Sequence, residues 1–185
     1  MAYEQTVAAV RDAIEASFAE LDRWFERPAA ERGYRPRDGG WTIDQLLEHV
    51  TLTSHFLLLI IRKGCAKAAK RAASVGLPAA GESDLAALEP IGHPDAFAWL
   101  RPEHMEPAGA PAAGVRGLLG RQRDECLALL DSIAGGAGAR YSVRMSVQSL
   151  GKLDMYQWLY FLAQHARRHG AEIAAVAREW EASND

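Results

Sequence analysis

Cysteine is nearly absent from this chain of 185 residues, which contains only Cys65 and Cys126. Two cysteines are too few for a disulfide framework or a cysteine-rich zinc site, so we expect two reduced thiols in a cytosolic protein. Long hydrophobic runs are also missing. The longest, residues 49–61, contains two histidines and several hydroxyl side chains and is shorter than the ~20 residues that span a membrane. Residues 1–5 lack the basic and then apolar pattern of a signal peptide. The sequence therefore predicts a cytoplasmic protein with no membrane partner.

A strong net charge of either sign is missing as well. The 21 basic and 24 acidic side chains give a formal net charge of −3 at pH 7. That balance does not indicate electrostatically driven binding to the phosphates of DNA or RNA. One basic run contains no acid and no interleaved aromatic residue, and such runs are usually solvated. We therefore expect no nucleic-acid partner, and a solvated face formed by Arg62, Lys63, Lys67, Lys70 and Arg71.

The composition that remains is that of an ordinary globular protein. Apolar residues make up 49% of the chain and charged residues 24%, which is too apolar for a disordered chain. A chain of this length corresponds to one domain, so we predict a single domain over residues 1–185. Abundant alanine and arginine, both strong helix formers, favour an all-α fold.

Four segments carry the 3.6-residue apolar period of helices. The first covers residues 7–25 and should end near Pro28. The second starts at Thr42, where Gln45 completes a capping-box pattern. Gly64 could end this second helix, or the alanine-rich stretch after it could continue the helix.

The third helix covers residues 115–133, and the glycines at 135 and 136 should end it. A brief alternation of apolar residues over 141–145 is typical of an extended piece. The fourth helix begins near Asp154, a good N-cap, and runs to about Glu181. Helices of these lengths suit a four-helix bundle.

Residues 74–112 differ from the rest because they contain most of the prolines and no sustained period. A helical turn is expected near residues 96–100. A connection of this length in a compact domain is often functional, as a lid or a partner surface. A strap packed over the bundle is the simpler interpretation, and we favour it. The fold prediction is thus an all-α, four-helix bundle with a long crossover connection between helices 2 and 3.

The spacing of the histidines indicates a metal site. His165 and His169 are four residues apart on the last predicted helix, so they project from one face, on or beside its apolar stripe. Two histidines at this spacing on an inward face form a natural bidentate metal site. His49, beside the apolar stripe of the second helix, is the better candidate for a third ligand, and His55 is the alternative. Three histidines would leave coordination positions open for water or substrate.

Each of these polar residues also has a purely structural interpretation. A pair of histidines at this spacing arises by chance, and buried rings can be satisfied by backbone or water. His93 and His104, in the connection, are expected to be solvated. Glu172 could orient a ligand histidine or be a surface carboxylate. Gln122, on the apolar face of the third helix, could hydrogen-bond a metal-bound water or a backbone group.

Two motifs resemble the DinB-like family. Gly39-Gly40-Trp41-Thr42 followed by Leu46-Leu47-Glu48-His49-Val50 resembles the start of the family's second helix. Its carboxy-terminal signature is matched by Leu150-Gly151-Lys152-Leu153, Trp158-Leu159-Tyr160-Phe161 and His165-Ala-Arg-Arg-His169. Similar proteins are four-helix bundles that bind a divalent metal, commonly nickel or zinc, through three histidines. The resemblance implies that the ligands here are His49, His165 and His169. The family often has Gln where this chain has Glu172, and residues 74–112 are poorly matched.

The resemblance also implies a chemistry. Members of the family include thiol-dependent transferases and isomerases that use low-molecular-weight bacterial thiols. We therefore expect a metal-dependent transferase that binds nickel or zinc, with iron as a further choice, and acts on a small molecule with such a thiol. Similar proteins are frequently homodimers, and the apolar breadth of the second helix would allow that. Arg167 and Arg168 could hold substrate carboxylates, but their wheel positions favour the surface or an interface.

Two other functions stay open. A hydrolase would use the same metal to attack an amide or ester, although Glu48 lies on the wrong side of its helix to act as the base. A non-enzymatic, metal-binding stress-response bundle is the other. Cys65 and Cys126 have no base partner and are not expected to be nucleophiles.

Overall fold

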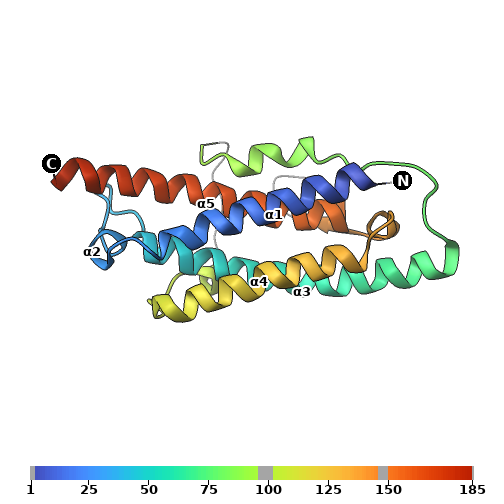
Figure 1. The fold of residues 1–185 in the computed structure, drawn as a ribbon, viewed down its shortest axis with the longest axis horizontal. Helices are drawn as coiled ribbons and strands as arrows, with labels where there is room; N and C mark the ends of the chain where they lie inside the picture. The colour runs from blue at the N-terminus through green and yellow to red at the C-terminus, as the bar shows by residue number, and fades with distance from the viewer. Residues whose placement is uncertain (1–2, 96–101, 146–149, 185) are drawn as a thin grey trace.

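The computed structural model describes residues 3–95, 102–145 and 150–184 (Figure 1). Helices make up most of this part of the chain, so the predicted all-α class is confirmed. The four long helices are α1 (Glu4–Trp24), α3 (Ile43–Val75), α4 (Ala112–Ser132) and α5 (Met155–Asn184). The shorter elements are α2 (Ala29–Arg32), the 3₁₀ helices η1 (Ala86–Gly92), η2 (Glu103–Met105) and η3 (Ala137–Arg140), and the strands β1 (Ser142–Met145) and β2 (Gly151–Asp154).

The long helices lie side by side along the molecule (Figure 1). Helices α1 and α3 each contact both α4 and α5. Their apolar stripes meet in one core, because residues three or four apart lie on the same helical face. Fully buried members of this core include Ile14, Leu21, Leu47, Ile61 and Leu159. In the described residues, no helix combines the length and the hydrophobicity that a membrane span requires.

Two capping boxes fix where α3 and α5 begin. At α3, Gln45 N donates to Thr42 Oγ1 (3.2 Å) and Thr42 N donates to Gln45 Oε1 (3.1 Å), as predicted. At α5, Gln157 N donates to Asp154 Oδ1 (2.9 Å) and Asp154 N donates to Gln157 Oε1 (3.0 Å). Each box satisfies backbone N–H groups that have no partner inside the helix. The predicted start of the last helix at Asp154 is therefore confirmed.

Helix α3 continues through Gly64 to Val75 and is capped by Gly76, whose φ of 82° is a left-handed value that favours glycine. The alanine-rich stretch thus extends the helix. Gly64 is needed for packing, because a Cβ built there would lie 2.1 Å from Met155 Sδ at the start of α5. This close approach fixes the position of α5 against α3.

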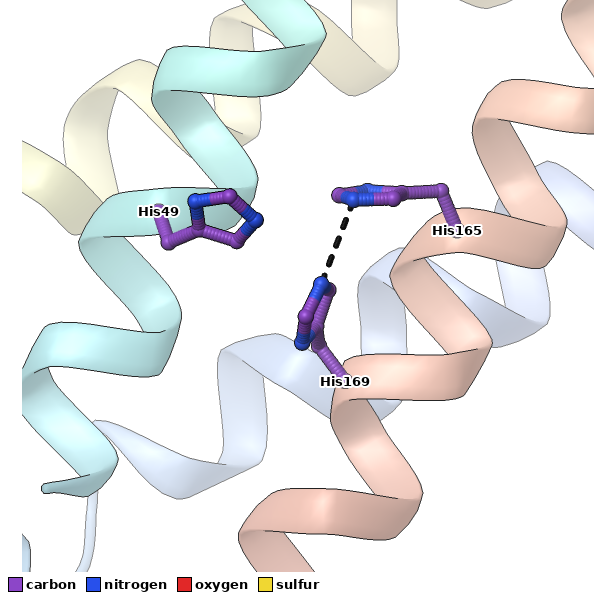
Figure 2. A group of neighbouring side chains, drawn as sticks. All are labelled: His49, His165 and His169. Carbon is purple, nitrogen blue, oxygen red and sulfur yellow. Dashed lines mark hydrogen bonds between the residues drawn. The ribbon is translucent and has the colours of Figure 1, made fainter. Parts of the chain in front are cut away.

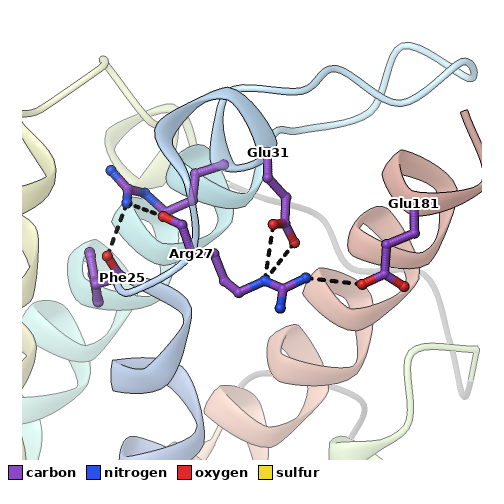
Figure 3. A network of polar contacts seen from close by, with 5 residues as sticks. Phe25, Arg27, Glu31 and Glu181 are labelled. Carbon is purple, nitrogen blue, oxygen red and sulfur yellow. Dashed lines mark hydrogen bonds and ion pairs between the residues drawn. The ribbon is translucent and has the colours of Figure 1, made fainter. Parts of the chain in front are cut away.

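Helix α1 ends at Trp24, earlier than the end predicted near Pro28. A polar network occupies this corner (Figure 3). Arg27 Nε donates to both carboxylate oxygens of Glu31 (2.9 and 3.0 Å), and Arg27 Nη2 donates to Glu181 Oε1 of α5 (2.9 Å). Arg32 Nη1 donates to the carbonyl of Phe25 (2.9 Å). Arg32 Nη1 also donates to the carbonyl of Arg27 (2.7 Å). The chain leaves the helix early because Arg32 binds these two turn carbonyls and because Pro28 disfavours a helical conformation in the residue before it.

The connection between α3 and α4 contains η1 and η2. Leu88 and Ile91 of η1 are buried, and η1 packs on α5, as the strap interpretation predicts. The helical turn expected near residues 96–100 lies outside the described residues. The extended piece predicted at 141–145 is β1, which pairs antiparallel with β2, with Met145 opposite Gly151. The single-domain assignment stays a prediction.

Candidate metal centre

The three predicted histidines lie together between α3 and α5. His49, His165 and His169 are 3%, 5% and 7% exposed, and their rings converge in Figure 2. The Nε2 atoms of His165 and His169 are 3.2 Å apart. One ring nitrogen from each of the three lies within 4.8 Å of the others. His55 is exposed on α3 and does not belong to this cluster.

The donor set fits a divalent metal. Two nitrogens bound tetrahedrally at ~2.1 Å from one ion lie about 3.4 Å apart, close to the 3.2 Å between the two Nε2 atoms of α5. Burial lowers the pKa of His165 well below its ordinary value, and the neighbouring histidines and Arg168 lower it further. His165 is therefore neutral at neutral pH, which is the form that binds a metal. Imidazole donors suit zinc, nickel and iron.

The connection orients His49. Its Nδ1 lies 2.8 Å from the carbonyl oxygen of Met105, at the end of η2. A carbonyl only accepts, so Nδ1 carries the proton and Nε2, which lies 3.5 Å from Thr53 Oγ1, keeps the lone pair that a metal would bind. The indole of Trp41, just before α3, lies against the same imidazole, with ring centroids 4.8 Å apart.

Glu172 orients His169. Its Oε2 accepts from His169 Nδ1 at 2.8 Å, which leaves Nε2 toward His165. Burial raises the pKa of Glu172, but the hydrogen bond from His169 and the electrostatic attraction of His169 and Arg168 outweigh it and hold that pKa below its ordinary value. Of the two roles open for Glu172, the structure supports the orienting one.

Arg168 was predicted to lie at the surface or at an interface, and the surface position is wrong. Arg168 is 8% exposed, with Nε 3.3 Å from Glu172 Oε1 and Nη1 donating to the carbonyl of His93 at 2.8 Å. The helical wheel failed here because the connection covers this side of α5, which α5's own periodicity cannot show. Arg167 is exposed, as expected, and so are His93 and His104.

Gln122 and Glu48 have backbone partners. Gln122 Nε2 donates to the carbonyl of Thr51 at 2.8 Å, which is the backbone alternative. Glu48 is buried, and its carboxylate accepts from three backbone N–H groups of the connection. Sequence reasoning had weighed Glu48 only as a base. An acid within the apolar stretch 46–50 was the signal that it needed a buried partner.

Both cysteines are buried, and burial raises the pKa of each thiol to about 12. Relative to the ordinary value of 9.0, such a pKa leaves about a thousandfold less thiolate, the reactive form. We therefore expect the native protein to be labelled by iodoacetamide at about pH 8 at least ~100-fold more slowly than an ordinary thiol. Mass spectrometry of native and denatured samples measures this. Rapid labelling of either cysteine in the native protein would contradict it.

A family model for the DinB superfamily matches residues 6–173, which include all three histidines of the cluster. No curated protein matches the chain, and no solved structure matches it. The family match covers most of the chain, and the chain therefore belongs to the DinB superfamily.

Proposed function

We propose that this protein is a metal-dependent transferase that activates a low-molecular-weight thiol. His49, His165 and His169 would hold the ion, with nickel or zinc the first choices and iron a further one. They would do so within a four-helix bundle that has a long crossover connection between α3 and α4. The observation that carries the proposal is the convergence of three buried histidines from two helices within 4.8 Å.

The bound ion would keep coordination positions open and lower the pKa of a thiol held there. A thiol held there would lose its proton to solvent, its sulfur would form a bond to an electrophilic carbon of the substrate, and that carbon would release its leaving group with the bonding electron pair. The chain's own side chains hold the site in shape. The Met105 carbonyl fixes the tautomer of His49, and Glu172 fixes that of His169.

The partners of the two nearby carboxylates favour this chemistry over hydrolysis. A metal-bound thiol ionises without a dedicated base, whereas hydrolysis usually employs a base for its water. Glu48 accepts three backbone N–H bonds, and Glu172 is bound to His169 and Arg168. Neither carboxylate is placed to take a proton from water.

The same proposal includes a small-molecule partner, a cytoplasmic location and no nucleic-acid partner. The scarcity of cysteine supports the cytoplasmic location, and the mild net charge of −3 supports the lack of a nucleic-acid partner. A homodimer is also proposed, supported by the exposed apolar side chains of Leu59 and Ile60 on α3.

The test is consumption of a chlorinated aromatic electrophile by the metal-loaded protein. We expect turnover only when metal, thiol and protein are all present, and a fall to the uncatalysed rate in His169→Ala. His55→Ala, which changes an exposed histidine outside the cluster, should keep wild-type turnover. Ester or amide hydrolysis without thiol would contradict the transferase and support a hydrolase. A metal-loaded protein inactive in both assays, across a panel of small thiols, would support the non-enzymatic bundle.

A further inference from the structure

Glu48 binds the end of the connection that leads into α4. Its Oε1 accepts from Ala108 N at 3.0 Å, and its Oε2 accepts from Gly109 N at 2.8 Å and from Ala110 N at 3.1 Å. Successive backbone N–H groups that point at one anion form a small anion-binding concavity. Gly109 has a φ of 86°, a value that favours glycine, which lets the chain turn around the carboxylate.

The same segment contacts His49, the residue next to Glu48. The Met105 carbonyl accepts from His49 Nδ1 at 2.8 Å, and Met105 Sδ lies 3.6 Å from Thr53 Oγ1, one turn along α3. Glu48 and His49 therefore hold one short stretch, residues 105–110, at two points. Any shift of this stretch moves the acceptor away from the imidazole.

Apolar packing contributes little to the position of residues 108–110, whereas His104, just before Met105, packs on Phe56 of α3 with ring centroids 4.2 Å apart. Ala108, Gly109 and Ala110 are exposed, and Met105 and Pro107 are only half-buried. By contrast, Glu48 is 5% exposed. Hydrogen bonds to an ionised acceptor are about twice as strong as those between neutral groups. The carboxylate of Glu48 is therefore the main attachment of residues 108–110 to α3.

We infer that Glu48 is a positioning residue for the metal ligand His49. It seats residues 105–110 so that the Met105 carbonyl keeps the proton of His49 on Nδ1 and leaves Nε2 ready for the ion. Without that acceptor the imidazole also populates the Nε2–H tautomer, which cannot bind a metal through Nε2. This inference rests on the proposed metal site. It adds to that site a residue that touches no ligand atom of the ion.

The test is Glu48→Gln, which keeps the size of the side chain but removes its charge and one acceptor oxygen. Loss of such an indirect contact typically lowers metal affinity by about 10- to 100-fold. We expect a loss of at least ~10-fold for zinc and nickel, measured by competition with a chelator. We also expect nitrogen NMR of the metal-free protein at about pH 8, above the ordinary histidine pKa of ~6.5, to show His49 moving from Nδ1–H toward Nε2–H.

Glu31→Gln is the matched control. Glu31 is also a buried glutamate, 2% exposed, but its carboxylate binds Arg27 in the polar network that follows the end of α1 (Figure 3). This change should lower stability and leave both the His49 tautomer and the metal affinity at wild-type values. If Glu48→Gln behaves like Glu31→Gln in both measurements, Glu48 is merely structural and the inference is wrong.

Two further outcomes need their own tests: a Glu48→Gln variant that does not fold, and a wild-type protein that binds no metal. If Glu48→Gln does not fold, Ala108→Pro replaces it, because proline removes one of the three N–H donors and leaves Glu48 intact. It should shift tautomer and affinity in the same direction by a smaller amount, and wild-type values for both would overturn the inference. If the wild-type protein binds no metal, the proposed function fails. The tautomer measurement on the metal-free protein then decides the role of Glu48 by itself.

Discussion

Replacing His165 or His169 by alanine is expected to abolish stoichiometric metal binding while the helical circular dichroism stays almost unchanged. Each histidine supplies one of three converging donors. Structural zinc sites bind with about 10–16 kcal/mol, or about 2.5–4 kcal/mol per ligand if four ligands share it equally. Loss of one ligand should thus lower the affinity by about two to three orders of magnitude.

The fold should survive these changes because the histidines are polar groups inside an apolar interface. Their removal costs packing but also relieves the burial of a ring that prefers water. The matched control is His55→Ala on α3, which removes an exposed imidazole outside the cluster. For the three variants, elemental analysis measures the metal content and circular dichroism measures the helix content. Wild-type stoichiometry in His169→Ala would contradict the assignment of the site.

Replacing Gly64 by valine is expected to lower the free energy of unfolding by about 3 kcal/mol, at the upper end of the usual cost of overpacking. A Cβ at this position would lie 2.1 Å from Met155 Sδ and 3.0 Å from its Cε. Met155 is fully buried, so its thioether can move only by displacing the close-packed side chains around it. The small gain in helix propensity over glycine does not offset this overlap. At about 2–4 °C per kcal/mol, Tm should fall by about 6–12 °C.

Gly120→Val is the control for Gly64→Val, since Gly120 lies within α4 and a Cβ added there would have nothing within 4 Å. It should be neutral or slightly stabilising. The double variant Gly64→Val/Met155→Ala should lose less stability than the sum of its two single changes, because the Met155 atoms that overlap the new side chain are gone. Thermal unfolding of the two glycine variants, of Met155→Ala and of the double variant measures these changes in stability. Equal Tm values for the two glycine variants would show that the Gly64–Met155 contact does not fix α3 against α5.

The long helices were predictable because their information is local. The apolar period predicted α1, α3, α4 and α5. The pattern at Thr42 predicted the capping box of α3, and Asp154 was predicted as the N-cap of α5, whose box with Gln157 only the structure shows. The spacing of His165 and His169 is also local, since it needs only the helical repeat.

What the sequence did not predict depends on the path of the connection. The burial of Arg168 follows from the strap that brings the His93 carbonyl to α5. The roles of Glu48 and Met105 follow from the return of residues 105–110 to α3. These contacts are made by backbone groups far along the chain, and neither residue type nor periodicity indicates where such groups will lie. The proposed metal site also depends on the path of the connection. The connection contacts His49 directly through Met105, and it contacts His169 indirectly through Arg168 and Glu172.

The central claim is that three histidines hold one divalent metal, and elemental analysis of the untagged wild-type protein tests it most directly. Protein purified without metal-affinity resin should contain close to one nickel, zinc or iron ion per chain, or take up one such ion when it is added after chelation. Wild-type protein that holds only trace metal after incubation with each of these ions would contradict the claim, and the transferase proposal with it.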